Sequence, residues 1–163
     1  MACRGVHFAI TASEADRLLK AEEESRIDIV QSEIEERGEE DWLYQTDKAW
    51  DAIHRCLCDG TLDPDGGSYP LKLAVLNGAQ LYSEDDYILS LVTPTEVRDV
   101  ADALAAIDQQ WLRTQYDGID PEDYGVEKTE TDWEYTWDYF EGLVPFFQRA
   151  AKAERYVLFS VDQ

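Results

Sequence analysis

Positive charge is scarce in this sequence. Its 163 residues include 14 Lys and Arg against 36 Asp and Glu, which gives a formal net charge of −22 at pH 7. Nucleic acids and anionic membrane surfaces are bound through positive side chains, so we expect no direct contact with either. No apolar run reaches the roughly 18–20 residues of a membrane span, and residues 1–11 lack the basic-then-apolar order of a signal peptide. These absences predict a cytoplasmic protein with no membrane partner.

Cysteine and histidine are also few. The chain has three cysteines, Cys3, Cys56 and Cys58. This number is small and cannot be paired completely, so it argues against a disulfide framework and favours a reducing compartment. The two histidines are His7 and His54, and His54 with Cys58 four residues on provides only half of a zinc site. We therefore expect no bound metal.

Motifs for enzyme chemistry are missing as well. The sequence has no phosphate-binding glycine loop and no nucleophile elbow. Acidic residues are so abundant that a carboxylate pair somewhere in the fold has no diagnostic value. We expect no cofactor and no catalytic residue, and the sequence favours a protein that is not an enzyme.

Apolar patterning predicts a single α+β domain over residues 1–163. Runs of β-forming residues at 5–11, 87–92 and 156–161 are typical of strands. Apolar residues at helical spacing predict helices within 12–19, 27–34, 47–57, 71–76, 94–111 and 133–151. We expect a small sheet of about three or four strands covered by five or six helices, undivided by any flexible linker.

Helix starts are marked by capping residues. Thr11 with Glu14, and Thr93 with Glu96, have the spacing of a capping box. Thr46 or Asp47 is the expected cap of the helix that carries Trp50.

Negative charge is concentrated in two helical segments. Residues 22–41 contain ten acidic and two basic side chains, and residues 120–141 contain nine acidic side chains and one lysine. If the two segments lie side by side, they form a surface that attracts basic partners. The alternative is a solvated surface that serves only solubility. The candidate interaction face comprises Glu33, Glu36, Glu39, Glu40, Glu130, Asp132, Glu134 and Asp138.

A second candidate site lies on the helix around residue 50. Asp51 and His54 are three residues apart on this helix, which suits a carboxylate that orients a base. His54 also lies on the apolar face that carries Trp50, where a hydrogen-bonded core histidine is the alternative.

Residues 47–60 resemble the Lys-x-Trp-x-x-x-His-x-x-Leu-x-x-Gly helix of the YfbM-like family of bacterial proteins, a domain of unknown function. The segments that follow match in order: residues 70–78, 91–97, 111–113 and 140–147. The resemblance implies a small α+β domain with Lys48, Trp50 and His54 as signature positions, and it implies no reaction. At these positions Trp50 would supply a stacking surface, His54 a donor or base, and Lys48 a contact for an anion. Packing of the helix against the sheet would produce the same spacing of Trp50 and His54, so the pocket and the purely structural role both remain open.

Two functions follow as hypotheses. The first is a non-enzymatic intracellular binding or regulatory module that presents an acidic face to a basic protein, of the immunity, inhibitor or DNA-mimic type. The alternative is a small-molecule-binding protein or enzyme with a cleft around Trp50 and His54. A concave pocket reached by the His54 ring would favour the second hypothesis.

Overall fold

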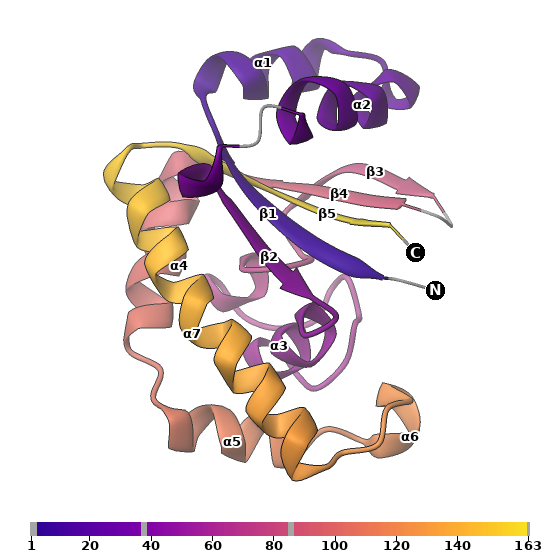
Figure 1. Ribbon diagram of the computed structural model, residues 1–163, viewed down its shortest axis with the longest axis vertical. Coiled ribbons are helices and arrows are strands. Elements are labelled where there is room, and N and C mark those ends of the chain that lie inside the picture. Colours follow the sequence, from indigo (N-terminus) through magenta and orange to yellow (C-terminus); the bar gives the residue numbers. More distant parts are fainter. Residues whose placement is uncertain (1–2, 37–38, 85–86, 163) are drawn as a thin grey trace.

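The computed structural model describes residues 3–36, 39–84 and 87–162. Within them the chain forms a five-stranded sheet of order β2-β1-β5-β4-β3, in which every neighbouring pair is antiparallel (Figure 1). The strands are β1 (Arg4–Ile10), β2 (Leu43–Asp47), β3 (Ala79–Glu84), β4 (Tyr87–Val92) and β5 (Tyr156–Asp162). The chain is an α+β fold, as the apolar patterning predicted.

Helices cover both faces of this sheet (Figure 1). One face carries α1 (Ala12–Lys20) and α2 (Glu23–Ile29), which continues as the π-helical segment η1 (Val30–Glu35). The other face carries α3 (Trp50–Leu57), α4 (Pro94–Ala105) and α7 (Glu130–Lys152). Helices α5 (Gln109–Asp117) and α6 (Pro121–Tyr124) extend this second layer away from the sheet.

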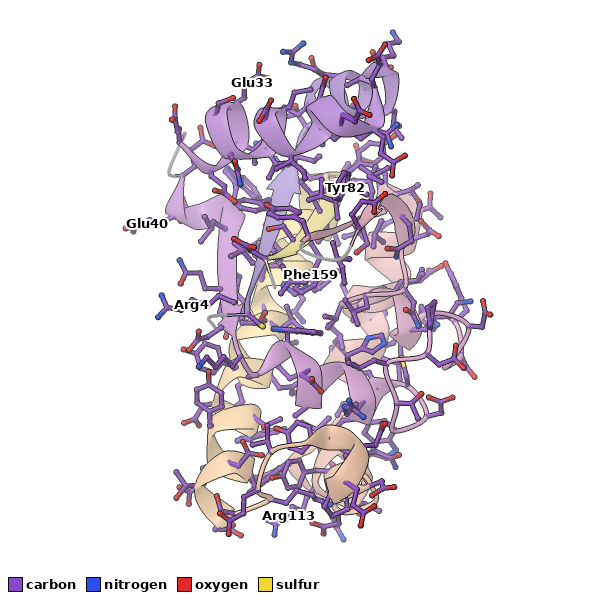
Figure 2. All side chains as sticks on the ribbon, turned by 90° about the vertical axis from the view of Figure 1, so that its right-hand side faces the viewer. Arg4, Glu33, Glu40, Tyr82, Arg113 and Phe159 are labelled. Atoms are coloured by element: carbon purple, nitrogen blue, oxygen red, sulfur yellow. The ribbon has the colours of Figure 1, made fainter. Side chains whose placement is uncertain are left out.

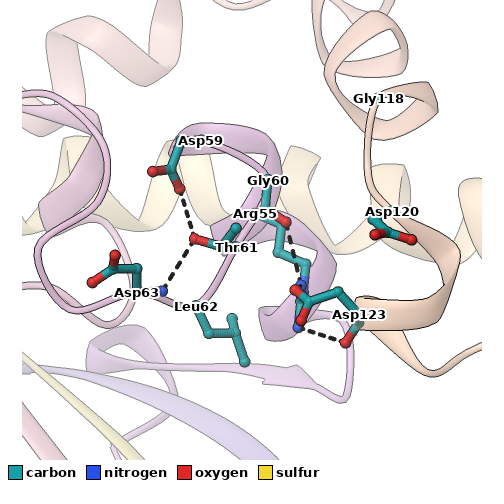
Figure 3. A pocket seen from close by; sticks show the side chains of 9 residues that line it. All are labelled: Arg55, Asp59, Gly60, Thr61, Leu62, Asp63, Gly118, Asp120 and Asp123. Carbon is teal, nitrogen blue, oxygen red and sulfur yellow. Dashed lines mark hydrogen bonds and ion pairs between the residues drawn. The ribbon is translucent and has the colours of Figure 1, made fainter.

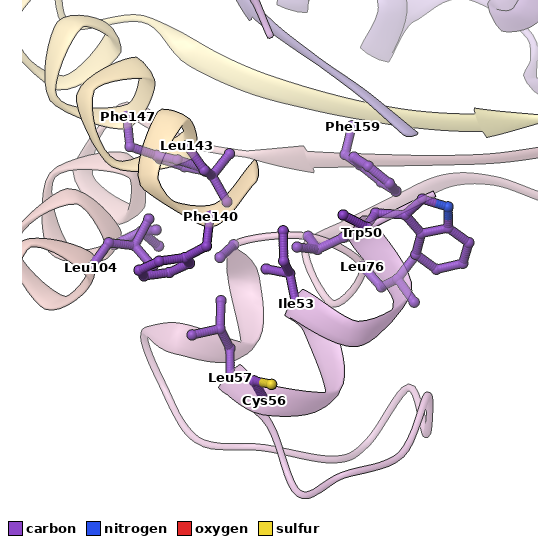
Figure 4. Packing of buried hydrophobic residues seen from close by; sticks show 14 of the residues in the cluster. Trp50, Ile53, Cys56, Leu57, Leu76, Leu104, Phe140, Leu143, Phe147 and Phe159 are labelled. Atoms are coloured by element: carbon purple, nitrogen blue, oxygen red, sulfur yellow. The ribbon is translucent and has the colours of Figure 1, made fainter. Parts of the chain in front are cut away.

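Strand side chains alternate between the two layers, as the period of two requires. Phe8 of β1 packs with the core under α1 and α2, whereas Ala9 packs with the larger core under α3, α4 and α7. Leu158 and Phe159 of β5 divide in the same way. In the larger core, Trp50 of α3 lies beside Phe159 (Figure 4).

Several local predictions are confirmed. The strands predicted at 5–11, 87–92 and 156–161 correspond to β1, β4 and β5. Both capping boxes are present: the Thr11 and Thr93 hydroxyls accept from the backbone N–H of Glu14 and Glu96, whose carboxylates accept in return.

The predicted numbers of strands and helices were too low. The described residues hold five strands and seven α-helices, and the strands that the sequence did not reveal are β2 and β3. Both are the edges of the sheet. Edge strands bury only part of their side chains, so their sequences lack the continuous apolar run that marks β4.

The predicted cap of α3 was wrong, because Thr46 and Asp47 belong to β2. The Thr46 hydroxyl donates to the carbonyl of Gly5 on β1, at 3.2 Å. Asp47 has a φ of 45°, and α3 starts after Ala49 without a side-chain cap.

Two helix predictions also need correction. Residues 71–76 hold only a 3-10 turn, η3 (Leu71–Leu73). The helix predicted over 94–111 is divided into α4 and α5, because the Asp108 carboxylate accepts from the backbone N–H of Trp111 and caps a second helix. Trp111 is consequently 39% exposed and not in the core.

Pro145 lies inside α7, which continues unbroken to Lys152. In the part of the chain that the structure describes, no helix combines the length and apolar character of a membrane span.

Gly5 allows β1 to approach α3 closely. A Cβ at this position would lie 2.7 Å from Thr46 Oγ1, 2.8 Å from the Phe159 ring and 2.9 Å from the Trp50 ring. The missing side chain therefore fixes where the start of α3 sits against the sheet.

Candidate functional site

Three of the four residues predicted to form a pocket do line one. Lys48, Trp50 and Asp51 lie at the start of α3 and border a cavity of about 310 Å³, which we call the Trp50 pocket. Its remaining lining comes from Cys3 before β1, Tyr124 and Val126 at and after α6, and Asp132 and Tyr135 on α7. The pocket is assembled from segments that are far apart in the sequence.

Trp50 forms a fixed wall of this pocket. Its Nε1 donates to the carbonyl of Cys3 at 2.8 Å, and its ring lies 6.0 Å from that of Phe159. The hydrogen bond and the ring contact both hold the indole from the side of the sheet, so it supplies a rigid apolar surface.

Tyr135 is held by bonds to the segment that precedes α3. Its hydroxyl donates to Asp47 Oδ2 at 2.8 Å and accepts from the backbone N–H of Lys48 at 3.1 Å. The side chain of Lys48 is exposed, and it makes no ion pair within the described residues.

Asp51 connects the pocket to a buried arginine. Its Oδ1 accepts from Arg55 Nε at 2.6 Å, and Arg55, only 4% exposed, also pairs with Asp123. Burial raises the pKa of Asp51; the bond from Arg55 opposes this shift, and the charges of Asp123 and Asp132 add to it.

Asp132 is held by two phenols and by no cation. Its Oδ2 accepts from the hydroxyls of Tyr116 at 2.6 Å and Tyr124 at 3.0 Å. Burial and the Asp132 carboxylate raise the pKa of both tyrosines, so the phenols remain protonated donors at neutral pH. No lysine or arginine of the described chain forms an ion pair with Asp132.

Arg55 itself lines a second cavity, together with residues 59–63 and with Gly118, Asp120 and Asp123 (Figure 3). This hollow, which we call the Arg55 hollow, has a volume of about 620 Å³. The guanidinium donates to the carbonyl of Gly60 at 3.2 Å and to Asp123. The carboxylates around it are those of Asp59, Asp63, Asp120 and Asp123.

His54 is not part of either cavity. Its side chain is 0% exposed, its Nδ1 accepts from the backbone N–H of Leu76 at 3.4 Å, and Cys58 Sγ lies 3.6 Å from its Nε2. Burial lowers the pKa of His54 to about 4 and raises that of Cys58 to about 12. With Nδ1 as acceptor the proton sits on Nε2, so the imidazole cannot take the thiol proton there.

The described residues contain no group of three or more His, Cys, Asp or Glu side chains arranged to hold a metal ion. Cys3, Cys56 and Cys58 are all free thiols.

The eight residues of the predicted acidic face are not brought together. Glu33 and Arg113 lie at opposite ends of the molecule in Figure 2. Glu33 forms a bidentate pair with Arg17 at one end, and at the other end both Glu130 oxygens accept from Nη1 of Arg113. The two acidic segments therefore do not form one surface.

The other members of that set are scattered between these ends. Glu36 follows η1, Glu39 and Glu40 border a shallow hollow at η2 (Glu40–Trp42), and Glu134 and Asp138 are exposed on α7. Asp132 alone lines the Trp50 pocket.

Comparison with known proteins identifies a family and a protein of similar fold, both of unknown function. The sequence model of a family described as "Domain of unknown function (DUF1877)" matches residues 1–160. A crystal structure of YfbM from Escherichia coli, a protein of unknown function, superimposes with a TM-score of 0.69 over 99% of both chains, at 23% sequence identity. No curated protein matches the sequence. The structural likeness shows a shared fold.

Proposed function

This chain belongs to the DUF1877 family, as its resemblance to YfbM-like proteins indicated, and we propose that it is a non-enzymatic binding module that presents an acidic surface to a basic protein partner. The surface is the one around Arg55, formed by the Trp50 pocket and the Arg55 hollow. Immunity, inhibitor and DNA-mimic roles are specific forms of this proposal.

One observation carries the proposal. The two cavities are lined by six carboxylates, those of Asp51, Asp59, Asp63, Asp120, Asp123 and Asp132, against the two cations Lys48 and Arg55. Concave surfaces lined by one sign of charge focus the field, which raises the local concentration of an oppositely charged partner. The net charge of −22 adds a long-range attraction for the same partner.

The geometry gives less support to the enzyme hypothesis. The imidazole and thiol nearest to each other, those of His54 and Cys58, are both held in the neutral state by burial. A nucleophile and base need ionisation near the working pH, so this pair lacks the required chemistry.

A labelled octa-arginine peptide tests the location of the binding surface. In the triple variant Asp59→Asn, Asp63→Asn, Asp120→Asn, each amide keeps an oxygen that can accept the local bond, which comes from the Thr61 hydroxyl or from the backbone N–H of Asp65 or Glu122. We expect the variant to bind the peptide about 5–10-fold more weakly than the unmodified chain at low salt, because three contacts of exposed carboxylates contribute about 1 kcal/mol or slightly more together.

The matched control removes three charges from the opposite layer: Glu24→Gln, Asp28→Asn and Glu36→Gln. These residues are exposed on α2 and after η1. If both triple variants lose affinity equally, net charge alone attracts the peptide and the proposed surface is wrong. Affinity that does not fall with added salt would contradict the proposal too.

A further inference from the structure

We propose that the Trp50 pocket binds the alkylammonium side chain of a lysine on the partner. This inference rests on the proposed function, because it assigns the residue of the basic partner that enters the acidic surface. The pocket volume of about 310 Å³ is at the small end of the range of roughly 300–1,000 Å³ for ligand cavities, which suits a single side chain.

The walls suit the aliphatic stem of a lysine. They comprise Trp50 of α3, Tyr124 of α6, Tyr135 of α7 and Val126, which follows α6, and they contribute aromatic and apolar surface. Four methylene groups can pack on these walls, and aromatic faces also attract a cation.

Two carboxylate oxygens are available for the ammonium head. Both phenol bonds to Asp132 end on Oδ2, and the Arg55 bond to Asp51 ends on Oδ1. Asp132 Oδ1 and Asp51 Oδ2 thus accept no hydrogen bond in the described chain. Among the described residues, only His7 Nδ1 is a fully buried side-chain atom without a partner, so neither of these two oxygens is completely shielded from solvent.

The arrangement favours lysine over arginine. An arginine fork bonds best to both oxygens of one carboxylate, and each carboxylate here already has one oxygen occupied. An ammonium group carries three donors that point in different directions, so it can bond to single oxygens on two different helices. Asp51 and Asp132 lie on α3 and α7.

Binding of capped amino acids tests this assignment. The probes are Nα-acetyl-lysine-N-methylamide, its arginine counterpart and its norleucine counterpart, titrated at pH 7 and low salt while the NMR signal of the Trp50 indole N–H is followed. We expect the lysine probe to bind at least about 5-fold more tightly than either of the others, since it alone combines a compact cation with an apolar stem. Equal or tighter binding of the arginine probe, or no saturable binding of the lysine probe, would overturn the assignment.

Two variants locate the bound lysine. Asp132→Asn keeps an acceptor for the tyrosines and removes the charge, so we expect about a 10-fold loss of affinity for the lysine probe. Asp138→Asn, exposed on the same helix and outside the pocket, should leave that affinity unchanged. Lys48→Met removes the cation at the rim and should strengthen binding about 2-fold. Equal effects of Asp132→Asn and Asp138→Asn would place the lysine elsewhere.

Cadaverine, a free diamine, separates the two sources of an alkylammonium group. Tighter binding of cadaverine than of the capped lysine would identify a free amine as the ligand and overturn the partner assignment. The octa-arginine experiment concerns the Arg55 hollow and contains no lysine. If it succeeds while the lysine probe fails to bind, the lysine assignment alone is wrong.

Discussion

At the scale of single residues, both histidines are kept neutral by burial. His7 Nε2 donates to the carbonyl of Ala74 at 2.8 Å, while its Nδ1 has no hydrogen-bond partner among the described residues. Phe146, Phe147 and Phe159 surround the ring. Burial lowers the pKa of His7 to about 4, the same value as for His54.

These lowered pKa values predict a loss of stability in mild acid. Between pH 6.5 and about 4 the unfolded chain binds protons at both imidazoles and the folded chain does not. Burial of the two neutral imidazoles therefore costs no stability above pH 6.5. As the pH falls from 6.5 toward 4, protonation of the unfolded chain lowers the free energy of unfolding. At pH 5 we expect the two histidines to lower the free energy of unfolding by about 2 kcal/mol each, measured by urea denaturation.

An NMR titration of the imidazole Cε1 protons provides the control, because the chain has only two histidines. Both rings should remain neutral at pH 5.5. An imidazole that titrates near pH 6.5 in the folded chain would contradict this account of its burial.

At the scale of the elements, the interior glycine of α7 is explained by a tyrosine on β2. The Tyr44 hydroxyl donates to the carbonyl of Tyr139 at 2.7 Å, and its ring occupies the space that a Cβ on Gly142 would need. This contact joins an edge strand to the longest helix of the described chain.

Gly142→Ala should therefore destabilise the protein. Helix propensity alone favours alanine over glycine by about 1 kcal/mol, but the overlap with Tyr44 costs more, and we expect a net loss of about 1–3 kcal/mol in the free energy of unfolding. Gly118→Ala is the control, because its nearest contact would be an ordinary 3.4 Å and its φ is −81°. If urea denaturation shows that Gly142→Ala raises the free energy of unfolding, the Tyr44 side chain can move aside without loss of stability, and the explanation is wrong.

The elements that sequence could predict are those with local signals. A few consecutive residues are enough to recognise the capping boxes at Thr11 and Thr93 and the apolar runs of β4 and β5. β2 does not, because its sequence Leu-Tyr-Gln-Thr-Asp becomes a strand only by pairing with β1.

The same distinction applies to the site. The helix pattern pointed to Trp50 and Asp51, and the resemblance to YfbM-like proteins added Lys48 beside them. Tyr124 and Asp132 reach the pocket through the fold and carry no local signal that links them to residue 50. His54 shares the helix but faces inward, where its spacing from Trp50 serves packing.

At the scale of the whole molecule, negative charge exceeds what the ion pairs neutralise. The pairs of Arg17 with Glu33 and of Arg113 with Glu130 occupy opposite ends, and the formal net charge remains −22. Self-repulsion of this size opposes the compact state.

Added salt should therefore stabilise the folded chain. Raising NaCl from about 10 to 300 mM shortens the Debye length from about 30 Å to below 8 Å, which screens repulsion across the surface more than it weakens contact pairs. We expect an increase of about 1 kcal/mol, or roughly 2–4 °C in the melting temperature measured by calorimetry. At lower pH, where the net negative charge is smaller, the gain should shrink. A melting temperature that falls with NaCl would show that local ion pairs outweigh the net charge.

The order of the strands also determines when the sheet can be completed during synthesis. β5 lies between β1 and β4 and is the only strand that joins β1 and β2 to β3 and β4 within the described residues. Until residues 156–162 have left the ribosome, the nascent chain can form only two separate pairs of strands. At that stage β1 and β4 still expose the edges that β5 will cover.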